Sequence, residues 1–182
     1  MTLGEEELRA KLDDDGVLRP GALPPPPRAR TYAIFSQRPD VMLDIETIKR
    51  QGARFFATKV GLTVDKRYGD APPIADAARM VVKSNDDSVS GTRLIYGRAA
   101  DAADVAAAEE AERQQGTTGM ALLAQRCPTI WLVVPESDDD RVALTIAAIF
   151  ASTMLGPILA PSGNEVFGVK TARAKLERLA RP

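Results

Sequence analysis

The chain has 182 residues, 45% hydrophobic and 27% charged, which are the size and composition of a single globular domain. Its formal net charge of −1 excludes the strong positive field with which many proteins hold nucleic acid, and we expect no nucleic-acid partner. With no histidine and one cysteine, Cys127, the sequence excludes Ser-His-Asp catalysis, imidazole zinc sites and an intramolecular disulfide.

Residues 1–29 are predicted to form an N-terminal arm that precedes a single α/β domain at residues 30–182. Prolines at positions 20 and 24–27 favour an extended polyproline II conformation in this arm. We interpret it as a tether, with a proline-rich ligand for an aromatic groove as the alternative. The acidic N-terminus does not resemble a secretory signal, and together with the lone cysteine it predicts a cytoplasmic location.

Strand and helix patterns alternate along the rest of the chain. The predicted strands are 31–36, 54–64, 92–96, 129–134 and 165–169, and the predicted helices are 40–51, 74–83, 101–115, 120–125, 142–155 and 171–180. A polar loop is expected at 84–91. Because parallel strands need helical crossovers, this alternation predicts a three-layer α/β domain with a mostly parallel sheet of about five strands and helices on both faces.

Residues 142–164 contain no charged side chain, which is long enough for a membrane span at 142–160. Pro157 ends or kinks a helix in this run, and the bulky and small residues of the helix segregate to opposite sides. The preceding strand pattern at 129–134 is typical of a buried parallel strand. We therefore favour a buried crossover helix and keep the membrane span as the alternative.

In an open parallel sheet, ligands bind beyond the carboxyl ends of the strands. The candidate ligand-binding residues there are Arg38, Arg98, Ser137 and Asp138. The two arginines could hold a phosphate or carboxylate, but we favour solvated or ion-paired surface positions for them. No cofactor is predicted, although Asp138 and Asp139 could carry Mg²⁺. We favour the interpretation that Asp138 caps the following helix, while Asp139 and Asp140 complement its positive end.

No catalytic residue can be assigned, and the sequence leaves three function classes. The first is a non-catalytic binding or assembly subunit that acts through protein–protein contacts and is oligomeric, with Ala147, Ala151 and Ser152 as the small-residue face of an interface helix. The second is a small α/β enzyme or ligand-binding domain for a phosphorylated or carboxylated metabolite. The third is a membrane-anchored protein. We favour the first class, with a protein partner or self-association.

Overall fold

The computed structural model describes residues 5–14, 19, 25–64 and 78–180. Its strands form one seven-stranded sheet in the order β2-β3-β4-β5-β1-β6-β7, and every neighbouring pair is antiparallel. The strands are β1 (Tyr32–Ser36), β2 (Thr58–Val64), β3 (Ala78–Ser84), β4 (Ser90–Ala99), β5 (Thr129–Val133), β6 (Ile158–Leu159) and β7 (Val166–Phe167). The helices are α1 (Glu5–Arg9), a 3-10 helix (Arg28–Arg30), α2 (Ile45–Phe56), α3 (Ala102–Gln115), α4 (Met120–Gln125), α5 (Arg141–Met154) and α6 (Val169–Leu179).

The prediction of a mostly parallel sheet with about five strands is wrong. Two crossover helices do join strands that run in the same direction, since α2 leads from β1 to β2 and α5 leads from β5 to β6. The joined strands are not neighbours, however. Strand β1 lies between β5 and β6 and is antiparallel to both, and three strands separate β1 from β2. Two helices therefore join strands of the same direction, as predicted for crossovers, but the strands that are adjacent in the sheet are antiparallel.

The connection between β4 and β5 is a second reason why the prediction of a parallel sheet failed. Helices α3 and α4, which contact each other, form this connection. Two successive helices carry the chain away from the sheet end and back again, so β5 begins where β4 ends. The register confirms this arrangement, because Ala99 at the end of β4 lies opposite Thr129 at the start of β5. A pair of helices thus joins antiparallel neighbours, as a hairpin loop would.

The helix predicted at 74–83 is also wrong where it can be examined. Residues 78–83 form part of β3, whereas 74–77 lie outside the described residues. Along β3 buried side chains such as Met80 and Val82 alternate with exposed ones such as Val81, which is the period of a strand. The following loop is a hairpin turn between β3 and β4, closed by a 2.8 Å hydrogen bond from the Ser84 amide to the Val89 carbonyl.

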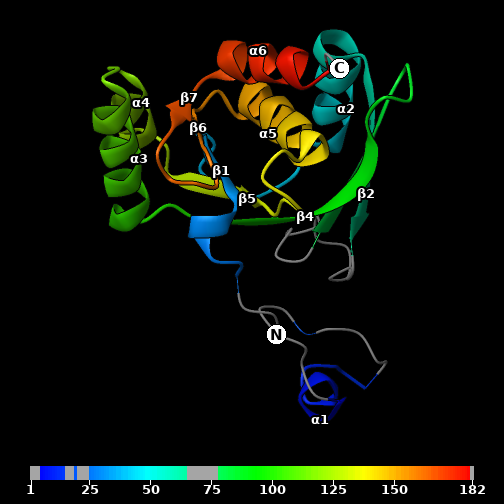
Figure 1. Ribbon diagram of the computed structural model, residues 1–182. Helices are drawn as coiled ribbons and strands as arrows, with labels where there is room; N and C mark the ends of the chain where they lie inside the picture. Colours follow the sequence, from blue (N-terminus) through cyan, green and yellow to red (C-terminus); the bar gives the residue numbers. More distant parts are fainter. Residues whose placement is uncertain (1–4, 15–18, 20–24, 65–77, 181–182) are drawn as a thin grey trace.

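Helix α5 lies on one face of the sheet with α2 and α6, as Figure 1 shows. Eleven of its 14 residues are buried, and the ring of Phe150 meets that of Trp131 edge-on with centroids 5.4 Å apart. On the opposite face, small residues of α3 and α4 cover Phe35 and Leu132. The predicted helix at 142–155 is confirmed. In the described part of the chain, no helix has both the length and the apolar character that a membrane span requires.

Gly97 of β4 packs closely against Trp131 of the neighbouring strand β5, and a stability prediction follows from this contact. A Cβ atom at this position would lie 2.9 Å from the ring of Trp131, which is fully buried and cannot move away cheaply. We expect Gly97→Ala to lower the free energy of unfolding by roughly 1–3 kcal/mol in chemical denaturation. Gly61→Ala is the control in another strand, because among the described atoms of the same chain the nearest to its new Cβ is the Cβ of Val81, at 3.7 Å. Equal stability of the two variants would contradict the packing described.

Candidate functional site: a charged cleft at one end of the sheet

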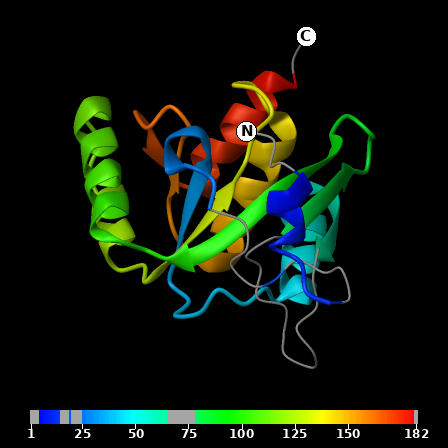
Figure 2. The same cartoon turned by 90° about the horizontal axis from the view of Figure 1, so that it is seen from below.

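An open cleft of 760 Å³ lies where β5 ends and β1 begins. Four segments line it: the start of β1 with the 3-10 helix before it, the loop from β5 to α5, the loop between β6 and β7, and the C-terminal part of α6. Figure 2 shows the loop before α5 next to the C-terminal part of α6. The cleft therefore brings together segments that are more than 100 residues apart in the sequence.

Asp140 holds in place the loop of Ser137, Asp138 and Asp139, which we call the acidic wall of the cleft. Its carboxylate caps α5 by accepting hydrogen bonds from the amides of Ala143 (2.9 Å) and Glu136 (2.8 Å). Arg93 of β4 reaches the same carboxylate at 2.5 Å and also pairs with Glu136 at 3.0 Å. Burial opposes ionisation of Asp140, but Arg93 and the two amides outweigh it and hold its pKa below the ordinary 3.8. The loop is thereby held with Ser137, Asp138 and Asp139 along the cleft.

This geometry corrects the cap assignment. The predicted cap of the helix was Asp138, whereas the structure places the cap at Asp140 and begins the helix at Arg141. Asp138 and Asp139 line the cleft, and neither makes an ion pair with a described residue. Across the residues that the structure describes, no cluster of three or more acidic or cysteine side chains is placed to hold a metal.

Tyr32 lies at the inner end of the cleft and is 7% exposed. Burial, and next the negative charges of Asp140, Asp139, Glu165 and Asp138, raise the pKa of its phenol to about 12. At neutral pH Tyr32 is consequently uncharged. It can offer a hydrogen bond to a bound group, but it is poorly suited to act as a general base.

Other segments of the lining carry the basic side chains Arg30, Lys175 and Arg178, which we call the basic wall of the cleft. Lys175 of α6 is bound to Glu165 at 2.6 Å and lies 5.2 Å from the centre of the Phe167 ring. Arg30 and Arg178 also line the cleft, are exposed, and make no ion pair with any described side chain. Counting only partners in the described ranges, the cleft thus presents two acidic groups from one loop and two basic groups from other segments that make no ion pair.

The predicted ligand-binding residues divide between the two ends of the sheet. Ser137 and Asp138 line the cleft, whereas Arg38 and Arg98 lie at the far end. The pairings show this, because Ser36, just before Arg38, lies opposite Thr129, and Arg98 lies opposite Ile130. In an antiparallel sheet the carboxyl ends of neighbouring strands point in opposite directions, so residues following different strands do not converge.

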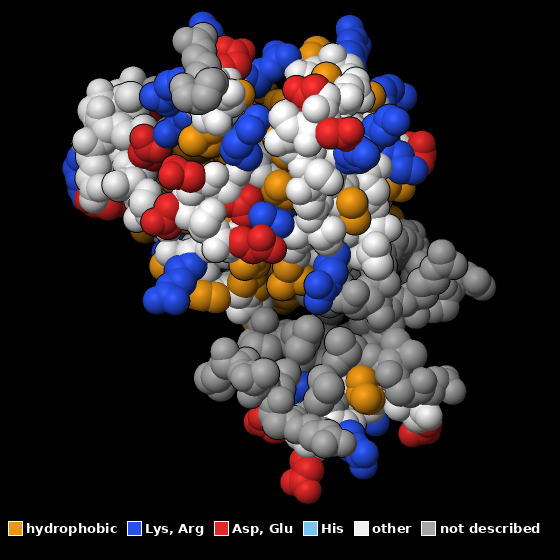
Figure 3. All heavy atoms as spheres, turned by 45° about the vertical axis from the view of Figure 1, so that its right-hand side comes forward, with side chains coloured by type: hydrophobic (Ala, Val, Ile, Leu, Met, Phe, Trp, Pro, Cys, Tyr) orange, Lys and Arg blue, Asp and Glu red, His pale blue; other side chains and the backbone are white. Residues whose placement is uncertain are grey.

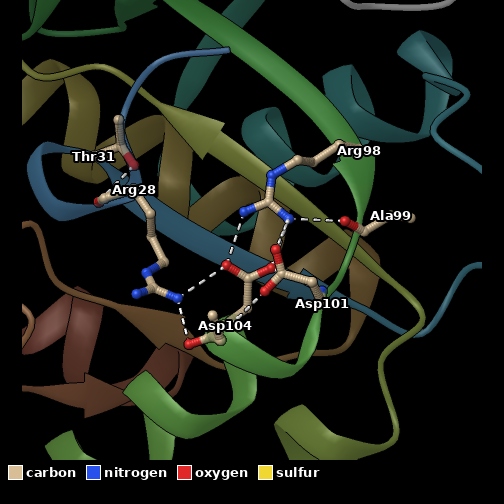
Figure 4. A network of polar contacts seen from close by, with 7 residues as sticks. Arg28, Thr31, Arg98, Ala99, Asp101 and Asp104 are labelled. Carbon is tan, nitrogen blue, oxygen red and sulfur yellow. Dashed lines mark hydrogen bonds and ion pairs between the residues drawn. The ribbon is translucent and has the colours of Figure 1, made fainter.

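Arg98 is occupied by a buried ion pair (Figure 4). Its two terminal nitrogens bind the two carboxylate oxygens of Asp104 at 2.6 and 2.8 Å, and Asp104 is fully buried. Arg28 approaches the same carboxylate at 3.2 Å and donates to the carbonyl of Ala103. Asp101 completes the arrangement as the cap of α3, forming a capping box with Asp104. This network joins the residues just before β1 to α3 and β4.

The small residues of α5 lie inside the chain's own core. Ala147 and Ala151 are 0% and 1% exposed, and α5 contacts α2, α6 and β1 at close range. Ser152 is half-buried and donates to the carbonyl of Ile149 at 2.8 Å. The close approach that these small side chains allow is therefore made within one copy of the chain.

Sequence reasoning missed the residues that complete the cleft, namely Arg30, Tyr32, Glu165, Lys175 and Arg178. Lys175 and Arg178 are three residues apart on one helix, which places them on the same side of it. That spacing was the one available signal. Nothing in the sequence connects this pair with the loop at 135–139. Cys127 lies in the core with α3 and α4, and burial raises the pKa of its thiol to about 11.

Comparison of the chain with family models, with curated proteins and with solved structures gives no match.

The Asp104 network gives a prediction of stability. Asp104→Asn removes the carboxylate between Arg28 and Arg98, and we expect unfolding free energy to fall by roughly 3 kcal/mol, the low end for breaking a buried ion pair, since both arginines reach solvent. Asp101→Asn is the control on the same helix, because asparagine also caps helices well and the exposed Asp101–Arg98 ion pair that it removes, at 3.6 Å, contributes little. Denaturant titration measures both, and an Asp104→Asn variant as stable as the control would refute the role of the network.

The Asp104 carboxylate also makes the free energy of unfolding depend on pH. Burial opposes its ionisation, but Arg98, the Asp101 amide and Arg28 outweigh burial and lower the pKa of Asp104 below 3.8. Its contribution is therefore complete above the unfolded-state pKa and is lost as the pH falls through the lower folded-state pKa. We expect stability measured from about pH 5 down to about pH 2 to fall less steeply for Asp104→Asn than for the unsubstituted chain. Parallel curves would contradict this assignment.

Proposed function

We propose that the chain is a non-catalytic binding subunit that acts through protein–protein contacts, with the charged cleft as the surface that receives a segment of its partner. The observation that carries this proposal is that Asp138 and Asp139 in the acidic wall line the same cleft as Arg30 and Arg178 in the basic wall. None of these four side chains makes an ion pair with a described residue. A segment with neighbouring acidic and basic side chains would satisfy both walls at once.

The form of the cleft favours a protein segment over a small molecule. Small-molecule sites are usually concave and bury most of the ligand surface. This cleft is open, and charged side chains from four separate segments line it. Each exposed ion pair contributes little by itself, roughly 0.2–1 kcal/mol, so useful affinity requires several contacts along an extended ligand.

The charge distribution of the surface agrees with a partner of mixed charge. On the face seen in Figure 3, Lys and Arg side chains are interspersed with Asp and Glu side chains. Such a surface lacks the single-sign field that steers polyanions to proteins. The pKa of Tyr32, raised to about 12, and the burial of Cys127 weigh against catalysis by these two groups. A cytoplasmic location is part of the proposal.

A second candidate is an anionic small molecule, such as a phosphorylated or carboxylated metabolite. Arg30 and Arg178, together with Lys175, favour it, since they place three positive side chains in one cleft. Here a phosphate or carboxylate would engage the basic wall alone. The two candidates therefore differ in whether the acidic wall takes part in binding.

The proposal predicts that both walls contribute to peptide binding. Random dodecapeptides would be selected by phage display against the full chain, and their affinities measured by fluorescence anisotropy. We expect the charge reversals Arg178→Glu and Asp138→Lys each to weaken binding, and the double variant Arg30→Glu/Arg178→Glu to weaken it about tenfold, equivalent to about 1.4 kcal/mol. Binding should also weaken as salt rises.

Lys170→Glu is the matched control, because it changes charge equally on the same helix at an exposed position that does not line the cleft. Selected peptides that bind all variants equally would refute the proposal. The second candidate would be supported instead by a metabolite that raises the melting temperature of the unsubstituted chain and the Asp138→Lys variant but not of Arg30→Glu/Arg178→Glu.

A further inference from the structure

The two edges of the sheet differ in how they are covered. Strand β7 is two residues long and contacts α3 and α4, and its Val166 amide donates to the Gln115 side chain at 2.8 Å. Strand β2, at the other edge, is seven residues long, and β3 is its one partner strand among the described residues. Figure 1 shows β2 on the side of the molecule away from α3 and α4. A long open edge is a template for pairing with another strand.

Apolar side chains are exposed next to this edge. Phe55, 39% exposed, lies at the end of α2 directly before β2. Val81 of β3, 38% exposed, lies opposite Gly61 of β2, where the missing side chain leaves it uncovered. The one charged residue in β2 is Lys59. The edge therefore has little of the charge that sheet proteins use to prevent pairing.

We propose that two copies of this chain pair through their β2 edges, antiparallel about a two-fold axis at Gly61, to form one continuous sheet. In this register Val60 lies opposite Leu62 of the second copy, and Lys59 lies opposite Thr63. Val60 and Leu62 belong to the apolar core under α2 and α5, so their pairing extends that core across the axis. The sequence of β2 is thus complementary to itself in the one arrangement that a symmetric dimer requires.

The positions of the lysines support a second copy of the chain as the partner of the β2 edge in this register. Each Lys59 faces a neutral Thr63, and the two lysines are four residues apart along the strands, roughly 13 Å. This separation exceeds the screening length of about 10 Å in 0.1 M salt, so their repulsion is weak. At the centre Gly61 lies opposite Gly61, where two side chains would otherwise meet. The dimer deepens the proposed assembly role, and it leaves the cleft at β1 and β5 of each copy open.

Mass measurement of the full chain by light scattering tests the dimer. We expect the unsubstituted chain to have twice its 19.6 kDa mass at micromolar concentration. Gly61→Glu should yield a monomer, because it places two carboxylates against each other at the axis. Thr92→Glu is the control, since it adds the same charge at an exposed position in β4, two strands from the edge. A monomeric unsubstituted chain, or a dimer unaffected by Gly61→Glu, would overturn the proposal.

A cross-linking variant tests the dimer independently, even if Gly61→Glu does not fold. Opposed residues in antiparallel strands have Cα atoms about 4.5–5.5 Å apart, a distance that a disulfide can span. Gly61→Cys should therefore form a disulfide-linked dimer on mild oxidation, whereas Thr92→Cys should not, and buried Cys127 should give no background. Equal cross-linking at both positions would refute the register. Peptide binding at the cleft should be unchanged in Gly61→Glu, so failure of the dimer and failure of the proposed function are distinguishable.

Discussion

The burial of helix α5 against the middle of the sheet is the constraint on which the rest of this structure depends. The helix has no charged residue after Arg141, so most of its surface must be covered by the chain itself. Strands β1 and β4 cover it from below, and α2 and α6 lie beside it. Its far end is fixed to β1, where Gln37 donates to the Met154 carbonyl at 3.1 Å and Phe35 to the Pro157 carbonyl at 3.0 Å. A side chain at Gly156 would collide with the backbone of Phe35, which shows how closely the chain turns there.

The same constraint creates the cleft. Helix α5 begins where β5 ends, and Asp140 with Arg93 holds that junction in place. Since β1 runs antiparallel to β5, its first residues lie at this end of the sheet, and β6 returns to it after α5. The charged residues around the cleft are therefore attached to strand ends and to helix α6, whose positions the core determines. A partner would meet a preformed arrangement of charges, which lowers the entropic cost of binding.

The sequence permitted good prediction of elements with strong local patterns. The uncharged run at 142–155 and the apolar run at 129–134 became α5 and β5, because the length of the first and the β-branched and aromatic residues of the second distinguish a buried helix from a buried strand. Residues 78–83 were misinterpreted, since alanine, arginine and methionine favour helices and the alternation along β3 was short. Strand adjacency could not be predicted, because it depends on contacts between distant segments rather than on local patterns.

The wrong prediction of a parallel sheet determined how well the site could be predicted. Ser137 and Asp138 were found because they follow a clear strand, and the structure places both in the cleft. Arg38 and Arg98 were grouped with them through the parallel sheet, and the antiparallel sheet separates them. Arg98 is engaged instead by the buried Asp104, whose acidic side chain looked like surface charge in the sequence. The basic wall depends on packing of α6, which no local pattern reveals.

The distance between residues 38 and 138 tests whether β1 and β5 are antiparallel and so place the cleft at one end of the sheet. Spin labels on the variant Arg38→Cys/Asp138→Cys would be measured by pulsed electron paramagnetic resonance, with the buried Cys127 unlabelled. Four residues of strand separate the two ends, which with the loops predicts a label distance of about 20 Å or more. A distance near 10 Å, as expected for carboxyl ends of parallel neighbours, would contradict the fold and the cleft together.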